Sequence, residues 1–453
     1  FLLLIFLLVP IITWASDAGH DAEVGHGAIA GTFLWIAIII IAAKFSSLVE
    51  KIGQPSVLGE LIIGVILGNL VLLGIHFFEP IKTNEIIMFL SELGVVILLF
   101  QIGLESNIHE MKKVGLKAGL VAIVGVVAPF VLGTYIIGPW LMPGLNSNAY
   151  LFLGAALTAT SVGITARVFR DLGKLQIKEA QIILGAAVID DVLGLIILAV
   201  ISAIVTLGAV SLGMIAWITA KAVLFLIGAI ILGQLLAPRL GKLFSKIHSG
   251  IGMKFSLAVC FGLILAWLAG KIGLAPIVGA FAAGLVLDPM HFKNFNKPKI
   301  VSDLGCAIRD NKCNKAMKKC LVKLGKHHEH AHIEELIEPI GMFLVPIFFV
   351  YTGMSVKLET MFDPKILAVA LGITVIAFIG KYVSGLVAGK GVNKSLIGFG
   401  MVPRGEVGLI FAMIGKQLGV VSDSVFSVIV IMVILTTLLT PPILNVLLKR
   451  QKA

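Results

Sequence analysis

The sequence predicts an all-α polytopic membrane protein with about 13 transmembrane helices, two inverted repeats and two discontinuous helices. Of its 453 residues, 58% are hydrophobic and only 13% are charged, and the mean hydropathy is +1.06. Both values lie outside the range of a soluble globular chain. In addition, apolar runs of about 17 to 25 residues, long enough to cross a bilayer, recur along the whole chain.

The apolar runs give the predicted spans. They lie near residues 29–49, 57–75, 86–104, 114–137, 149–169, 180–207, 212–236, 251–269, 272–287, 339–356, 366–388, 395–418 and 425–448. With the N-terminus outside and the C-terminus in the cytoplasm, most Lys and Arg residues fall on the inner side, as the positive-inside rule requires. The net charge of +11 therefore marks cytoplasmic loops, and we expect no nucleic-acid partner.

The start of the chain, residues 1–16, resembles the apolar core and small-residue cleavage site of a secretory signal whose basic beginning is missing. An ordinary first membrane segment cut short is the alternative. Either interpretation is compatible with an integral membrane protein.

A basic insert between the ninth and tenth spans, residues 288–338, carries clustered cysteine and histidine residues. The weak metal-ligand candidates are Cys306, Cys313, Cys320, His327, His328, His330 and His332. Their spacing matches no zinc module, which favours a solvated amphipathic linker with reduced thiols. We therefore assign no metal and no cofactor.

Two spans contain features that an uninterrupted helix avoids. The fifth, "LGAALTATSVGITARVF", concentrates hydroxyl groups at Thr158, Thr160 and Ser161, and the twelfth, "IGFGMVPRGEVGLIFA", places Pro403 among glycines. Non-helical backbone at membrane depth is tolerated only where it is buried in protein or lines a cavity. Because the two spans run in opposite directions, they fit inverted repeats of spans 4–6 and 11–13 around a transport site. Two continuous, glycine-rich helices are the alternative.

Adjacent carboxylates, Asp190 and Asp191, lie in the middle of the sixth span. Charged groups at this depth are costly and usually functional. Consecutive helical residues point about 100° apart, so we expect the two aspartates to have different functional roles. Lys381, deep in the eleventh span, is the predicted charge partner of one of them; the alternative is a lysine that reaches the membrane interface.

Two further cations, Lys221 and Arg404, lie within predicted spans. We interpret Arg404 with Glu406 as a structural charge pair of the discontinuous twelfth span. Backbone carbonyls freed by the fifth span, together with hydroxyls of Thr158, Thr160 and Ser161, are the candidate ligands of a hard cation.

Several longer motifs resemble the bacterial monovalent cation/proton antiporters of the second of the two large cation/proton antiporter families. They are "GQPSVLGELIIGVILG" at 53–68, "LLFQIGLES" at 98–106, "TATSVGITARV" at 158–168, the acidic pair, "PIFFVYTGM" at 346–354 and "MVPRGEVGLI" at 401–410. The resemblance implies a homodimer with a scaffold domain and a mobile core domain with crossed discontinuous helices. It also implies that Asp191 is the principal ion and proton carrier, that Asp190 pairs with Lys381, and that the protein belongs to the electrogenic sodium branch.

This resemblance and the span pattern together divide the chain. The predicted parts are scaffold helices at 29–104, a first core repeat at 114–207, scaffold helices at 212–287, the insert at 288–338, a scaffold or linker helix at 339–356 and a second core repeat at 366–448.

The expected function is secondary active transport by alternating access, in which Na⁺ (or Li⁺ or K⁺) exchanges for protons and serves pH homeostasis. A K⁺/H⁺ antiporter of the same fold is the main alternative. A cation channel is disfavoured by the deep Lys381. An intramembrane aspartyl protease is disfavoured because adjacent acids on one helix diverge. We expect no enzymatic activity, and membrane lipid as the surroundings.

Overall fold

The computed structural model describes most of the chain. The described residues are 26–52, 55–105, 115–171, 174, 177–207, 212–287, 295, 315–357, 359 and 363–450. The predicted signal remnant, Cys306 and Cys313 lie outside them, as do the side chains of residues 315–332.

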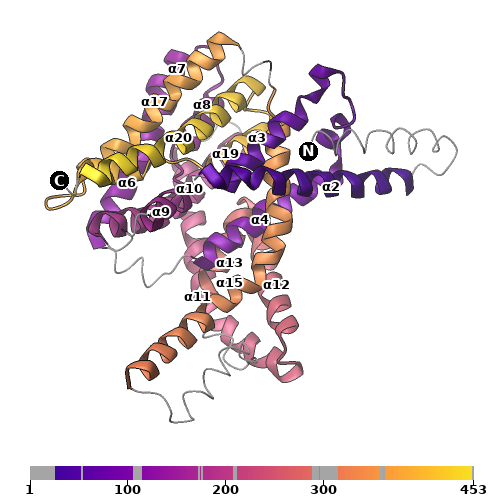
Figure 1. Ribbon diagram of the computed structural model, residues 1–453, viewed down its shortest axis with the longest axis vertical. Helices are drawn as coiled ribbons and strands as arrows, with labels where there is room; N and C mark the ends of the chain where they lie inside the picture. The colour runs from indigo at the N-terminus through magenta and orange to yellow at the C-terminus, as the bar shows by residue number, and fades with distance from the viewer. Residues whose placement is uncertain are drawn as a thin grey trace. The chain divides into compact units, whose positions relative to one another are not determined.

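The described residues form helices and no strand (Figure 1). In chain order the longer helices are α2 (His26–Ser46), α3 (Ser56–Gly68), α4 (Glu85–Glu105), α6 (Gly115–Val131), α8 (Ser147–Ala156), α9 (Val162–Asp171), α10 (Lys178–Leu207), α11 (Leu212–Ile247), α12 (Ile251–Lys271), α13 (Pro276–Val286), α15 (Lys315–Met354), α17 (Pro364–Leu386), α18 (Lys394–Gly400), α19 (Glu406–Gln417) and α20 (Asp423–Arg450). Short 3-10 turns (η1, Ser47–Ile52; η2, Leu70–Leu73; η3, Glu79–Thr83), a π-helical turn (η4, Leu132–Ile137) and a single α-turn (α7, Gly138–Leu141) connect them.

Among the described residues, nine helices are long and apolar enough to cross a membrane. Each contains or overlaps one predicted span. The second and ninth predicted spans correspond to the shorter apolar helices α3 and α13. The fifth and twelfth correspond to the helix pairs α8/α9 and α18/α19. The all-helical membrane architecture is therefore as predicted, while a full set of 13 crossings stays a prediction.

Two helices are longer than their apolar sequences indicate. Helix α11 continues past residue 236, where the predicted span ends, and α15 begins inside the basic insert and crosses the predicted boundary at 338/339 without interruption. Lys and Leu recur in both extensions and Glu recurs in that of α15; all three are good helix formers whether or not they are apolar. A criterion based on apolar runs detects the membrane-buried part of a helix and misses its polar continuation.

The chain divides into two compact units. Unit 1 comprises Phe1–Gly94 and Phe343–Ile366, and unit 2 comprises Val95–Met342 and Leu367–Ala453.

Within unit 1, α3 packs closely on the end of α15. A Cβ atom at Gly64 would collide with the carbonyl of Val350, and one at Gly353 would lie 2.9 Å from the Cα of Gly64. Two facing glycines therefore let the two backbones touch. The Asn69 amide, which follows α3, donates to the carbonyl of Val356 at 2.8 Å and so closes the same contact.

Unit 2 contains the two discontinuous helices together with α6, α10, α17 and α20 (Figure 1). Helix α6 contacts α10, and α20 contacts α8, α9, α18 and α19. Pro129 interrupts the hydrogen bonding of α6, which continues as the π-helical turn η4. The backbone of Gly154 in α8 packs directly onto that turn, beside Thr134.

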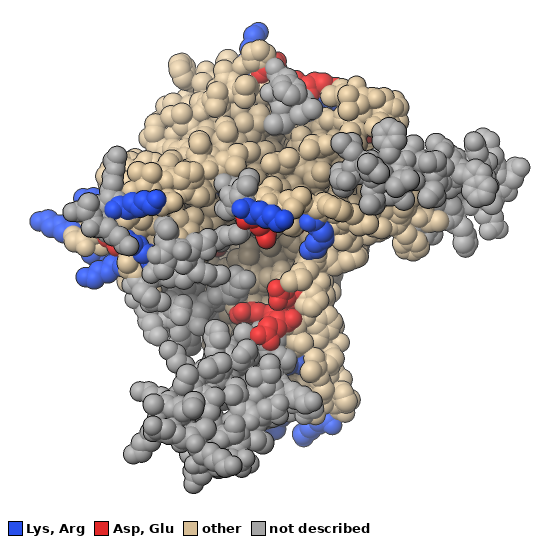
Figure 2. All heavy atoms as spheres, viewed as in Figure 1, with Lys and Arg blue, Asp and Glu red and all other residues tan. Residues whose placement is uncertain are grey.

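One end of unit 2 gathers basic side chains, visible at the left edge of Figure 2. The Lys117 ammonium at the start of α6 donates to the carbonyl of Lys390, at 3.3 Å. Lys174 donates to the carbonyl of Leu448 near the end of α20, at 3.2 Å. These bonds tie α6 to the segment after α17, and the segment after α9 to the end of α20.

Candidate functional site

The first discontinuous helix stops at a cluster of hydroxyl residues. Helix α8 begins at the Asn146 cap, whose side chain accepts from the Asn148 N–H, and ends at Ala156. The Thr158 hydroxyl then donates to the carbonyl of Ala155 at 2.7 Å. Threonine hydroxyls that bond locally compete with the helical backbone pattern, and the chain runs non-helically until α9 begins at Val162.

The second discontinuous helix stops around Pro403. Helix α18 is capped by the Asn393 side chain, which accepts from Leu396 N–H at 3.1 Å, and ends at Gly400. Residues 401–405 are non-helical, and α19 begins at Glu406. Proline has no N–H and disfavours a helical conformation in the residue before it, so the interruption falls where the sequence places it.

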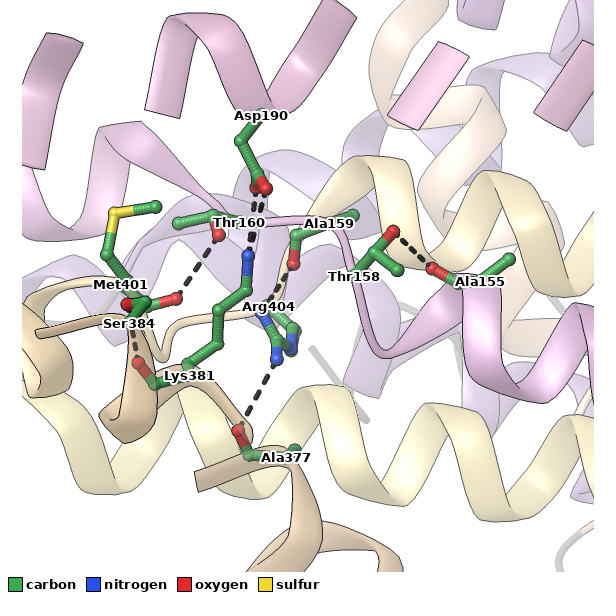
Figure 3. Close-up of polar contacts among 10 residues, drawn as sticks. All are labelled: Ala155, Thr158, Ala159, Thr160, Asp190, Ala377, Lys381, Ser384, Met401 and Arg404. Atoms are coloured by element: carbon green, nitrogen blue, oxygen red, sulfur yellow. Dashed lines mark hydrogen bonds and ion pairs between the residues drawn. The ribbon is translucent and has the colours of Figure 1, made fainter. Parts of the chain in front are cut away.

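The two breaks satisfy each other's backbone groups. The Ser161 N–H donates to the carbonyl of Pro403 at 2.8 Å, and the Thr160 hydroxyl donates to that of Met401 at 3.2 Å (Figure 3). The Thr165 hydroxyl of α9 donates to the carbonyl of Gly400 at 2.7 Å. Interrupted backbone inside a membrane requires such partners, so each break is the structural support of the other.

Arg404 joins three segments at this crossing. Its side chain is fully buried; Nη1 donates to the carbonyl of Ala159 at 2.8 Å and Nη2 to that of Ala377 at 3.4 Å (Figure 3). Ala159 belongs to the first break and Ala377 to α17, one turn before Lys381. The side chain of its predicted partner, Glu406, lies outside the described residues, so that pair stays a prediction.

Lys381 and Asp190 form a buried ion pair. Lys381 Nζ lies 3.0 Å from Asp190 Oδ1 and 3.1 Å from Oδ2, and both side chains are 0% exposed. The pair joins α17 to α10. Gly125 of α6 packs beside the lysine: a Cβ there would lie 3.5 Å from Nζ and 3.3 Å from the Ser384 Cβ. The Ser384 hydroxyl donates to the Lys381 carbonyl at 2.6 Å.

The two adjacent aspartates have different surroundings. Asp190 is 1% exposed, whereas Asp191 is partly exposed. Their divergence is the expected consequence of the 100° rotation between consecutive helical residues. One carboxylate is therefore held by a lysine in a buried position, and its neighbour is less enclosed.

The predicted hydroxyl ligands lie at the first break and are buried. Thr158, Thr160 and Ser161 are 0%, 3% and 4% exposed. The Thr158 and Thr160 hydroxyls donate to carbonyls, which leaves their oxygen lone pairs available as acceptors. Such oxygens, with a carboxylate, suit a hard monovalent cation.

Several residues that build the site were not singled out as site residues from the sequence. They are the carbonyl acceptors Ala159 and Ala377, the donors Thr165 and Thr437, and Gly125. The string "TTLLTPP" at 436–442, with hydroxyls and prolines inside an apolar span, was the available signal for Thr437.

The remaining candidates lie away from this site or cannot be placed. Lys221, in α11, donates to the carbonyl of Ile272 at the end of α12, at 3.2 Å, which is a capping role. Cys320 and the four histidines of the insert lie in α15, and their side chains are not described. Among the described residues, no group of three or more His, Cys, Asp or Glu is placed to hold a metal ion.

Discontinuous helices that meet around buried charges define a membrane transport protein. The family model for "Sodium/hydrogen exchanger, transmembrane" matches residues 36–304 and 321–450. The chain belongs to this sodium/hydrogen exchanger family.

Two bacterial relatives cover nearly the whole chain. The high-affinity Na⁺/H⁺ antiporter NhaS3 of Synechocystis sp. is 34% identical over 98% of this chain and 95% of its own. The Na⁺/H⁺-K⁺ antiporter GerN of Bacillus cereus is 33% identical over 91% and 95%. The solved structure of the sodium proton antiporter MjNhaP1 from Methanocaldococcus jannaschii has a TM-score of 0.62 at 16% identity and covers 92% of this chain and 97% of that one, which shows the same fold.

Proposed function

We propose that the protein is a secondary active transporter that exchanges Na⁺ for protons by alternating access. The observation that carries this proposal is the partly exposed Asp191 beside the buried Asp190–Lys381 pair, next to the crossing of two discontinuous helices. Family membership and the antiporter names of the relatives support it.

In the proposed cycle Asp191 is the shared carrier. A sodium ion binds only the ionised carboxylate, with oxygen ligands from the first break: Thr158, Thr160 or Ser161 and nearby carbonyls. A proton binds the same carboxylate and excludes the ion. With either one bound, the Asp191 carboxylate itself is neutralised and can cross the dry part of the protein, whereas the empty, charged carboxylate resists the movement. That difference couples the two fluxes.

We propose that protonation of Asp190 in the Asp190–Lys381 pair makes the cycle electrogenic. When a proton neutralises Asp190, Lys381 keeps its charge, so the proton-loaded form carries one charge more than the sodium-loaded form. Two protons then exchange for one sodium, and the membrane potential contributes about 2.3 kcal/mol per 100 mV to sodium exit.

The wider assembly is proposed on the same basis. We place the basic end of unit 2 in the cytoplasm of a bacterial inner membrane, because Lys and Arg mark the inner side. The opposite directions predicted for α8/α9 and α18/α19 support inverted repeats at 114–207 and 366–448 as the mobile core. The remaining helices are the proposed scaffold of a homodimer.

The direct test is proton flux in vesicles that contain the purified protein, reported by a pH-sensitive dye as sodium, lithium and potassium are added in turn. Sodium should drive proton movement in the wild-type protein. Asp191→Asn should abolish the flux while the protein remains folded and elutes as the wild type does, because the shared carboxylate is lost.

The matched control for this variant is Asp423→Asn. Asp423 is also a partly exposed carboxylate of a long helix, but it pairs with Lys416 at 2.9 Å, near the junction of α19 and α20. Its replacement should leave sodium-driven flux intact. Sodium-driven flux at the wild-type rate in Asp191→Asn vesicles would contradict the assignment of Asp191 as the carrier.

Potassium is the second candidate ion. The name of GerN, Na⁺/H⁺-K⁺ antiporter, favours it, and oxygen ligands bind either ion. Dye signals that are larger with potassium than with sodium would select this alternative.

A further inference from the structure

Arg404 is held at its main chain as well as at its guanidinium. The hydroxyl of Thr437, in α20, donates to the carbonyl of Arg404 at 2.7 Å. Thr437 is 4% exposed and Arg404 is fully buried, so water does not compete for this bond and its strength is close to that in an apolar interior.

Neighbouring threonines of α20 make a different kind of bond. The Thr436 hydroxyl donates to the carbonyl of Met432 at 2.9 Å, and that of Thr440 donates to Thr436 at 2.7 Å. Both bonds stay within α20, as is usual for threonine in a helix. The Thr437 bond leaves its own helix and reaches the non-helical segment 401–405.

The position of the Arg404 side chain depends on this segment. Nη1 and Nη2 donate to Ala159 and Ala377, while Nε has no hydrogen-bond partner among the described residues. The guanidinium is therefore fixed at one end only. A small shift of the Arg404 main chain would displace its bond to Ala159, a residue of the same break that carries Thr158 and Thr160.

Three other carbonyls, at the end of α18 and in the second break, are held by the first discontinuous helix and its break. Gly400, Met401 and Pro403 accept from Thr165, Thr160 and Ser161, respectively. Thr437 gives the crossing a hydrogen bond from a third element. It holds the segment at Arg404, whose guanidinium donates to Ala159.

We propose that Thr437 is a positioning residue for cation binding: its hydroxyl holds the Arg404 main chain so that the guanidinium, through Ala159, keeps the first break in its binding geometry. This inference rests on the proposed exchange function. It assigns to α20 a part in ion affinity, which Thr437 exerts through the Arg404 main chain.

Loss of this hydroxyl should weaken ion binding more than it weakens turnover. Thr437→Val keeps the shape and removes the donor. We expect the KM for sodium to rise about fivefold, the factor that corresponds to one typical net hydrogen bond, with the maximal rate nearly unchanged. Thr437→Ser, which keeps the hydroxyl, should restore the wild-type KM.

The experiment compares sodium-driven proton flux in vesicles of the wild type, Thr437→Val, Thr437→Ala, Thr437→Ser and Thr440→Val, over a range of sodium concentrations. Thr440→Val is the matched control, because it removes an equally buried hydroxyl that bonds only within α20. Thermal unfolding in detergent is measured for each variant, and Thr437→Ala replaces Thr437→Val if the valine variant does not fold.

A raised KM in the Thr437 variants without the hydroxyl, its rescue by serine and a normal KM in Thr440→Val support the inference. A wild-type KM in Thr437→Val, failure of the serine variant to restore it, or an equal rise in Thr440→Val would overturn the inference alone. No sodium-driven flux in the wild type would overturn the proposed function, and this inference with it.

Discussion

At the scale of single residues, the site depends on how two adjacent aspartates are separated. Helical rotation points Asp190 toward Lys381 of α17 and leaves Asp191 partly exposed. Two charges in the same dry pocket would repel each other, and a single lysine would have to neutralise both. The two orientations place each carboxylate in different surroundings, and the helix needs no distortion of its backbone to do so.

The buried pair should show strong energetic coupling. Lys381→Ala or Asp190→Ala leaves one uncompensated buried charge, which costs about 3 to 5 kcal/mol, whereas the double replacement removes both charges. The double variant should therefore lose far less stability than the sum of the single variants, measured by thermal unfolding in detergent.

The control for this cycle is the pair Lys416–Asp423, whose side chains are 29% and 34% exposed. Partly exposed pairs contribute about 0 to 1 kcal/mol, so the same cycle there should be almost additive. Additive losses at Lys381 and Asp190 as well would argue that the buried pair does not hold the helices together.

Much of this residue-scale picture could be predicted from the sequence, because an isolated charge in an apolar run has few possible partners. The acidic pair and Lys381 were identified in this way. The partners of Arg404 could not be identified, since they are main-chain carbonyls, and every residue type has one. Charged residues in a sequence therefore predict side-chain partners of opposite charge but do not predict which backbone carbonyls accept hydrogen bonds.

At the scale of elements, the two broken helices form one structural unit. Pro403 and the hydroxyl cluster at 158–161 predicted where each helix would stop, because both features are local chemistry. Which carbonyl accepts from which donor depends on how two segments far apart in the chain approach each other, for example Ser161 and Pro403. That information is tertiary and no local pattern contains it.

A methyl group at the crossing should damage it. A Cβ at Gly405 would lie 2.7 Å from the Ser161 Cβ, whereas at Gly408, in α19, the nearest atom is 3.4 Å away. Gly405→Ala should therefore lose about 1 to 3 kcal/mol of stability and lower sodium-driven flux. Gly408→Ala, an ordinary helical substitution, should keep both; thermal unfolding and vesicle flux measure the difference. Equal behaviour of the two variants would contradict the close crossing.

The basic insert should be dispensable for exchange. It lies outside both proposed repeats, and its second half forms only the start of α15, before the apolar span Ile333–Met354. Replacing residues 303–332 with a short flexible linker should leave vesicle flux at the wild-type rate. Total loss of flux in a well-folded variant would place the insert in the transport mechanism.

If the insert binds metal, a chelator should change the activity only while its cysteines and histidines are present.

At the scale of the whole molecule, composition and the distribution of charge were enough to predict the class of protein. Hydropathy identifies membrane-spanning helices because every backbone group inside a bilayer needs an internal partner. It fails at α3 and α13, whose helical parts are shorter than their apolar runs, and at α11 and α15, which continue into polar sequence. The length of an apolar run in the sequence reflects the thickness of the membrane. The length of a helix also depends on local helix propensity and on packing.

The whole-molecule prediction concerns the membrane potential. If Lys381 keeps its charge while Asp190 and Asp191 both take up protons, each cycle moves one net charge, and a negative interior should accelerate sodium exit with protons entering in excess. Sodium exchange would be recorded in proteoliposomes with the potential clamped by potassium and valinomycin, and Asp191→Asn vesicles would give the background. A potential of about 100 mV is worth about 2.3 kcal/mol per charge, enough to change the rate visibly. A rate that does not change with this potential would contradict the two-proton cycle and would favour one-for-one exchange, in which the Asp190–Lys381 ion pair remains intact throughout.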